Sequence, residues 1–214
     1  MSAVIYVHGM WMPGVEMVFL KHHLLKHHGF DGRLFSYPSV RGTLDENAAL
    51  LDEYVREHAD GELLHLVGHS LGGVLLLRML ALNPEAPVHR AVCIGSPLSG
   101  SRAAIDLSRR GWGKTILGKT VAGGVVGEPA SEWSANVTAR YEVGIIAGTV
   151  AAGMGRLVTS FDGPSDGTVA VAETELPGAK DHLCVALSHS ALVLSKAVGD
   201  QVAAFLEHGE FLRD

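Results

Sequence analysis

The stretch that most constrains this chain runs from Leu63 to Gly73 and reads Leu-Leu-His-Leu-Val-Gly-His-Ser-Leu-Gly-Gly. Its first five residues are mostly apolar and lie between two glycines, a pattern typical of a short buried strand. The Leu-rich residues 74–82 that follow predict a helix. Between strand and helix, Gly68-His69-Ser70-Leu71-Gly72 matches Gly-x-Ser-x-Gly. This order predicts a nucleophile elbow, a turn so tight that its flanking positions must be glycine.

A serine at such a turn is predicted to be a nucleophile. The hydroxyl of Ser70 would be exposed beside the N-terminus of the helix, whose free N–H groups and dipole favour developing negative charge. The five-residue pattern recurs by chance, so the prediction depends on its place between an apolar strand and an apolar helix. The alternative is an ordinary Gly-rich turn in which Ser70 has no chemical role.

The rest of the chain predicts an α/β fold. Short apolar runs typical of strands occur at residues 3–7, 33–37, 63–67, 88–94, 141–147 and 183–187. Helical patterns lie between or after them, at residues 16–28, 43–58, 74–82 and 191–206. Such alternation predicts a sheet of about six strands, mainly parallel, with helices on both faces.

Two of these helices carry specific local signals. In the helix at 43–58, Thr43 is a candidate N-cap and Glu46 stands three residues on, which makes a capping box. In the first helix we expect an apolar stripe toward the core, formed by Val15, Val18, Phe19 and Leu25.

Size and composition favour one globular domain over residues 1–214. The net charge of −6 argues against a nucleic-acid partner. The first residues lack the basic and long apolar segments of a signal peptide, and no apolar run approaches the length of a membrane anchor. Cys93 and Cys184 lie in separate apolar strands, so we expect buried free thiols. We therefore expect a cytoplasmic protein, a monomer or a weak homodimer.

One segment breaks the alternation of strands and helices. Residues 99–137 follow the strand at 88–94, and their glycine-crowded part, 111–127, mixes basic with apolar side chains. An insertion at the carboxyl end of a strand lies where ligands bind in open α/β sheets. We expect a mobile, cap-like insertion over Ser70, with Trp112 facing the substrate groove. The alternative is a surface excursion without a role.

A nucleophilic serine needs a base within hydrogen-bonding reach. His189 directly follows the strand at 183–187, and all strands of a parallel sheet deliver their carboxyl ends to one edge, so His189 can meet Ser70. His182 precedes that strand and is expected at the opposite edge. The alternative role for His189 is to cap the last helix.

The first predicted helix carries a second group of histidines, namely His22, His23, His27 and His28. His23 and His27 have the i, i+4 spacing of a metal-binding pair, but the sequence shows no carboxylate or cysteine beside them. We expect a solvated basic face and no metal site.

The acid that orients the base should lie between Ser70 and His189 along the chain. The loop after the strand at 141–147 offers Asp162 and Asp166. Asp162 stands in an Asp-Gly-Pro turn, where its carboxylate can simply bond to the backbone. Asp166 precedes an apolar run at 169–171 that must pack inward, so we favour Asp166 and keep Asp162 as the alternative.

The oxyanion of an acyl-transfer intermediate needs two backbone N–H donors. The elbow offers that of Leu71. The second should come from His8-Gly9-Met10-Trp11, where Gly9 lets the backbone approach closely. We expect Met10 to be this donor, with Trp11 as the second choice. The alternative is that His8-Gly9 forms a plain strand-end turn.

These motifs together resemble a small α/β-hydrolase of the lipase/esterase kind. The resemblance rests on Val-His-Gly-Met, Gly-His-Ser-Leu-Gly-Gly, Gly-Ser-Pro-Leu-Ser-Gly, Ser-Asp-Gly-Thr-Val and Ser-His-Ser, in this order along nearly the whole chain. It implies the α/β-hydrolase fold and a Ser–His–Asp triad of Ser70, His189 and Asp166, with no metal or organic cofactor. Gly95-Ser96-Pro97 resembles the Gly-Thr-Pro stretch that lines the pocket of such lipases, which implies Ser96 and Pro97 as pocket residues. We also expect Trp11 and Trp112 at this pocket.

The resemblance implies an esterase that acts on small acyl esters or lipid-like substrates through an acyl-enzyme. Two features depart from the larger members of this family. The sequence shows no long amphipathic lid, and its first strand would correspond to the third strand of the larger fold. The same triad serves a thioesterase or acyltransferase, and the same fold serves non-hydrolytic ligand binding. An intact triad disfavours that last alternative, because a pure binder has no need of a serine coupled to a base.

Overall fold

The computed structural model describes residues 3–11, 14–109, 118–152 and 163–213. Its sheet has six strands in the order β2-β1-β3-β4-β5-β6, and every neighbouring pair is parallel. This confirms the predicted α/β architecture. The strands are β1 (Ala3–Val7), β2 (Asp31–Phe35), β3 (Leu64–His69), β4 (Val88–Ile94), β5 (Glu142–Gly148) and β6 (Asp181–Val185).

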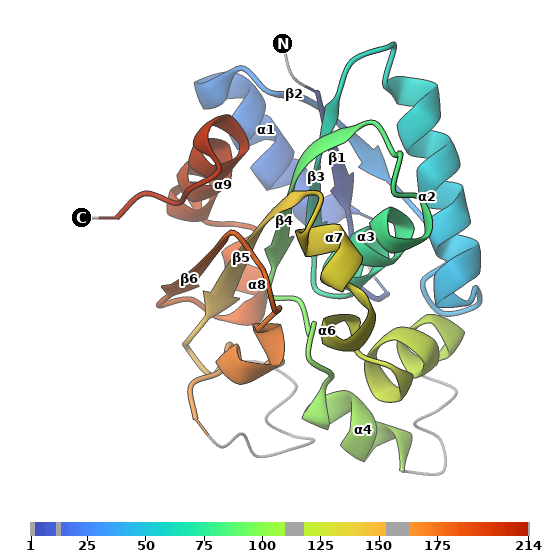
Figure 1. The fold of residues 1–214 in the computed structure, drawn as a ribbon. Helices are drawn as coiled ribbons and strands as arrows, with labels where there is room; N and C mark the ends of the chain where they lie inside the picture. The colour runs from blue at the N-terminus through green and yellow to red at the C-terminus, as the bar shows by residue number, and fades with distance from the viewer. Residues whose placement is uncertain (1–2, 12–13, 110–117, 153–162, 214) are drawn as a thin grey trace.

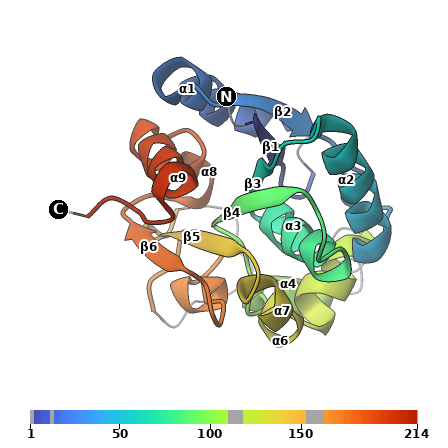
Figure 2. The same cartoon turned by 45° about the horizontal axis from the view of Figure 1, so that its top comes forward.

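Helices cover both faces of the sheet (Figures 1 and 2). Helices α1 (Val18–His28) and α9 (Lys196–His208) lie on one face, and α2 (Leu44–His58) and α3 (Leu71–Leu82) lie on the other. Strand β1 shows how the sequence produces two cores. Val4 and Tyr6 pack toward α1 and α9, whereas Ile5 and Val7 pack toward α2 and α3, because neighbouring residues of a strand point to opposite faces.

The capping box predicted for α2 is confirmed. The Thr43 hydroxyl accepts the Glu46 N–H at 3.2 Å, and the Glu46 carboxylate accepts the Thr43 N–H at 2.8 Å. Two N–H groups that have no partner inside the helix are thus satisfied.

The apolar stripe predicted for the first helix is wrong. Val15, Val18, Phe19 and Leu25 are exposed, and the core is instead contacted by Met17, Leu20 and Leu24. Apolar residues lie on both sides of this helix, so periodicity alone could not predict which side is buried. The contact of α1 with α9 and β2 decides which side is buried.

The predicted closing helix is also divided in two. Residues 191–206 were expected to be one helix, but a short helix, α8 (His189–Leu192), is followed by α9, which begins only after Ser195. The Ser195 hydroxyl accepts the Val198 N–H at 3.4 Å and so caps α9. The break places His189 at the start of its own short helix.

The described parts of the insertion at 99–137 pack against the rest of the domain. They form α4 (Arg102–Ser108), a π-helical turn (Ala122–Gly127), α6 (Ala130–Trp133) and α7 (Ala135–Thr138). Thr120 accepts a hydrogen bond from the Asn47 side chain at 2.9 Å and donates one to the Gly42 carbonyl at 2.7 Å. Val121 and Val125 are part of the core beside α3. Residues 110–117, including Trp112, lie outside the described residues.

Two smaller expectations concern the thiols and the membrane. Cys93 and Cys184 are both free, as predicted, but only Cys93 is buried. Cys184 is exposed because β6 is an edge strand of the sheet. None of the helices in the described residues has the length and apolar character needed to cross a bilayer.

Candidate active site

Ser70 lies on a strained turn between β3 and α3. Its φ of 53° and ψ of −122° place a non-glycine residue in a region that L-residues rarely adopt. A Cβ at Gly68 would lie 2.6 Å from both the Gly72 carbonyl carbon and the Gly73 nitrogen. Real Cβ atoms do not approach backbone so closely, so the glycine at this position is required by the turn itself.

His189 and Asp166 form a hydrogen-bonded pair. Nδ1 of His189 lies 2.6 Å from Oδ2 of Asp166, and the His189 backbone N–H donates to the Asp166 carbonyl at 3.0 Å. Asp166 is only 1% exposed. Its other carboxylate oxygen accepts the N–H groups of Thr168 and Val169 at 2.8 and 2.7 Å. The carboxylate is therefore held in one orientation, and it fixes a proton on Nδ1 of the imidazole.

The pair lies beside the turn that carries Ser70. The ring centroids of His189 and His69, the residue before Ser70, are 4.8 Å apart. A Cβ at Gly95, which follows β4, would lie 3.2 Å from both Asp166 Oδ2 and His189 Nδ1. The Ser70 N–H donates to Ile94, the last residue of β4, at 2.9 Å. The three predicted triad residues therefore gather at the carboxyl ends of β3 and β4.

His182, the rejected candidate for the base, lies elsewhere. It is the second residue of β6, and its Nε2 lies 2.9 Å from the Thr174 hydroxyl. Asp162, the alternative acid, lies outside the described residues.

His69 is a buried neighbour of the imidazole of His189. Burial, followed by the proximity of His189, lowers the pKa of His69 to about 3. Its ring is therefore neutral at any ordinary pH, and it adds no positive charge beside His189.

The loop after β1 is held by a network that sequence reasoning missed. His8 Nδ1 lies 2.6 Å from the Gly9 carbonyl oxygen, and its Nε2 accepts the Tyr37 N–H at 3.3 Å. The Tyr37 hydroxyl donates to the His8 carbonyl at 3.0 Å, and Glu16 accepts the Gly9 N–H at 3.3 Å. Burial lowers the pKa of His8, which favours the neutral ring that both contacts require. No local motif links Tyr37 or Glu16 to this loop.

The two candidates for the second oxyanion donor differ in their partners. The Trp11 N–H already donates to the Ser39 hydroxyl at 3.2 Å, so it is engaged elsewhere. By contrast, the backbone N–H groups of Met10 and Leu71 donate to no acceptor in the loops and turns that the structure describes. A Cβ at Gly9 would lie 3.2 Å from the Ser70 Cβ, so the loop is in contact with the elbow. These contacts favour Met10 over Trp11.

The expected pocket residues fall into different environments. Ser96 and Pro97 are buried, and a Cβ at Gly73 would lie 2.7 Å from the Ser96 Cβ, so Ser96 packs against α3. Trp11, at the end of the proposed oxyanion loop, is 48% exposed. Trp112 lies outside the described residues.

Glu173 ties the acid loop to the insertion. One carboxylate oxygen accepts the Ala170 N–H at 2.8 Å, and the other accepts the Arg102 N–H at 2.5 Å at the start of α4. Burial is the main effect on this carboxyl and raises its pKa. The loop that carries Asp166 is thus bonded to α4, the helix that follows β4.

Replacing Tyr37 by phenylalanine tests the network around the oxyanion loop. Loss of the bond to the His8 carbonyl costs about 1 kcal/mol of stability. If the loop places an oxyanion donor, we expect kcat for ester hydrolysis to fall about tenfold as well. Tyr141→Phe is the matched control, because its buried hydroxyl also donates to a backbone carbonyl, that of Pro84 at 2.7 Å. Equal kcat in the two variants would contradict the assignment.

The comparisons with known proteins identify the fold. A family model described as the alpha/beta hydrolase fold matches residues 24–116. A search of curated protein sequences gave no match. Among solved structures, the mature form of the lipase BlEst2 from Bacillus licheniformis superposes with a TM-score of 0.79 at 20% identity, over 97% of this chain and 91% of that one.

Two further structures share the fold. Phospholipase PlaB from Legionella pneumophila has a TM-score of 0.65 at 18% identity, over 98% of this chain and 57% of that one. The metagenomic carboxyl esterase MGS0156 has a TM-score of 0.61 at 18% identity, over 91% of this chain and 70% of that one. The sheet order, the elbow and these similarities together show that the chain has the α/β-hydrolase fold, in a small form similar to lipases and esterases.

Proposed function

We propose that this protein is a serine hydrolase of carboxylic esters, with Ser70, His189 and Asp166 as its catalytic triad. The observation that carries the proposal is the pairing of His189 with the buried Asp166, 2.6 Å apart, beside a serine on a strained elbow. A buried carboxylate bonded to Nδ1 leaves Nε2 as the basic nitrogen of the ring. The resemblance to lipases and esterases supports the same assignment.

In the proposed reaction, Ser70 Oγ attacks the acyl carbon while His189 Nε2 takes its proton. The negative charge that develops on the carbonyl oxygen is stabilised by the N–H groups of Leu71 and Met10. His189 then gives the proton to the leaving alcohol, and an acyl-enzyme remains on Ser70. Water, activated by His189 in the same way, attacks the acyl-enzyme and releases the acid.

The Asp166 carboxylate has a defined part in both steps. When His189 carries two protons, the adjacent negative charge stabilises the imidazolium. The N–H donors from Thr168 and Val169 keep this carboxylate oriented. The neutral ring of His69 adds no positive charge that would destabilise the His189 imidazolium.

A fluorophosphonate probe tests the proposal. Such probes react with a serine only when a base activates it, so we expect stoichiometric labelling of the folded protein on the peptide that contains Ser70. Protein denatured before the reaction should remain unlabelled. p-Nitrophenyl esters from acetate to palmitate then report turnover and the preferred acyl length. A folded protein that neither labels nor hydrolyses any of these esters would favour a non-hydrolytic binding role.

A further inference from the structure

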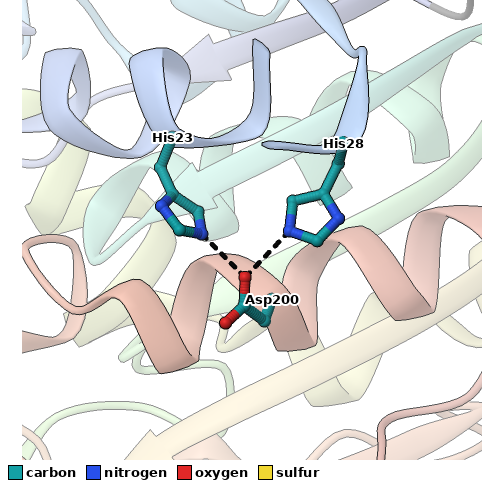
Figure 3. Close-up of side chains that lie close together, drawn as sticks. All are labelled: His23, His28 and Asp200. Atoms are coloured by element: carbon teal, nitrogen blue, oxygen red, sulfur yellow. Dashed lines mark hydrogen bonds and ion pairs between the residues drawn. The ribbon is translucent and has the colours of Figure 1, made fainter. Parts of the chain in front are cut away.

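The histidines of α1 meet a carboxylate from the opposite end of the chain. His23 and His28 belong to α1 and Asp200 to α9, two helices that lie side by side (Figures 1 and 3). Nε2 of His23 lies 2.7 Å from Asp200 Oδ1, and Nε2 of His28 lies 2.8 Å from the same oxygen. The expectation of a solvated basic face with no carboxylate nearby was therefore wrong for His23 and His28.

We propose that His23, His28 and Asp200 bind a divalent transition-metal ion of the Zn²⁺ type. Two imidazole nitrogens and one carboxylate oxygen are ligands that zinc accepts, with solvent completing its coordination. Calcium and magnesium prefer oxygen ligands, so the two imidazoles disfavour both ions. The ligand atoms of the three side chains all lie within 4.8 Å of one another, so one ion can reach all of them.

Small movements bring these atoms to coordination distances. Ligand atoms bound about 2.0–2.2 Å from a tetrahedral ion are separated from each other by roughly 3.3–3.6 Å. The carboxylate oxygen must therefore move away from both nitrogens by less than an ångström. The two nitrogens lie within 4.8 Å of each other and must come together by no more than about 1.5 Å. The Asp200 side chain is 47% exposed and has room to do so. To bind the ion through Nε2, each imidazole must carry its one proton on Nδ1.

A glycine on α9 makes this arrangement possible. A Cβ at Gly199 would collide with Cδ2 of His23 and lie 3.1 Å from its Nε2. Glycine is unfavourable inside a helix, so its presence here needs a local reason. The close approach of the His23 ring to α9 supplies that reason, and it is this approach that brings the ring to Asp200.

An ion at this position would join the first helix of the chain to the last. None of the residues proposed for the triad or the oxyanion hole belongs to α1 or α9. Metal binding is therefore expected to raise the stability of the fold, whether or not the protein hydrolyses esters. This separation allows the metal site and the proposed function to be tested independently.

The full chain, freed of metal with a chelator, is titrated with Zn²⁺ in a calorimeter and its melting is followed by circular dichroism. We expect one ion to bind per chain. At a free Zn²⁺ concentration about 100 times the dissociation constant, the melting temperature should rise by about 5–10 °C. Failure to bind Zn²⁺ even at millimolar concentration would overturn the proposal.

Variants separate the site from the other histidines. Asp200→Asn keeps an oxygen that can accept the imidazole N–H groups but is a poor metal ligand, and His28→Gln removes the more exposed imidazole. Both should weaken Zn²⁺ binding by about 100-fold or more. His22→Gln is the matched control, because His22 is exposed on the same helix and outside the cluster. Unchanged affinity in a folded Asp200→Asn or His28→Gln protein would show that Zn²⁺ binds elsewhere.

Discussion

Replacing Ser70 or His189 by alanine is expected to reduce kcat for ester hydrolysis by about 10⁶-fold while the protein stays folded. Without Ser70 no acyl-enzyme can form, and without His189 no group removes the hydroxyl proton. The two losses should not add, because the residues act as one unit. Steady-state turnover of a p-nitrophenyl ester measures the effect, and circular dichroism checks the fold.

His182→Ala is the matched control for the histidine. His182 is also partly buried and also bonds to a side chain, that of Thr174, but it lies near the amino end of β6. We expect it to keep most of the wild-type activity. An active His189→Ala protein together with an inactive His182→Ala protein would overturn the assignment of the base.

Asp166→Asn is expected to reduce kcat by about 10⁴-fold, because an amide cannot hold the imidazole in the required tautomer. The buried Asp166 now accepts one N–H from His189 Nδ1 and two from the backbone. An asparagine has an NH₂ group in place of one carboxylate oxygen. This group would face either the His189 ring N–H or the two backbone N–H groups. The imidazole would then turn or change tautomer, and Nε2 would no longer be basic toward Ser70.

Asp162→Asn is the comparison for the acid. We expect this variant to retain most of its activity, since the sequence Asp-Gly-Pro predicts a turn residue at Asp162, and His189 already has Asp166 as its partner. Measured side by side under the same conditions, an inactive Asp162→Asn protein and an active Asp166→Asn protein would reverse the assignment.

The sequence predicted the parts of the fold that local signals determine. The six strands, the capping box of Thr43 and Glu46, and the glycines of the elbow depend on neighbouring residues or on a single turn. The meeting of Asp166 with His189 followed from strand polarity, because parallel strands end at the same edge. These features needed no knowledge of which helix packs against which.

The features that sequence reasoning missed depend on distant contacts. The buried side of α1 could not be chosen because apolar residues occur on both sides of that helix, and only its packing against α9 decides. For the same reason, nothing near His23 and His28 indicated Asp200, which lies more than a hundred residues along the chain. The role of Tyr37 at the loop after β1 likewise comes from the pairing of β1 with β2.

The bond between Glu173 and Arg102 sets limits on how this protein could be engineered. A graft that replaced the insertion from a point before Arg102 would remove the N–H that holds Glu173. The loop of Asp166 would then lose one of its anchors, and activity would fall for reasons unrelated to the new pocket. A graft that extended past residue 118 would remove Thr120 and Val121 from the core. An exchange that keeps the chain through Arg102 and from Gly118 onward would leave both sets of contacts in place.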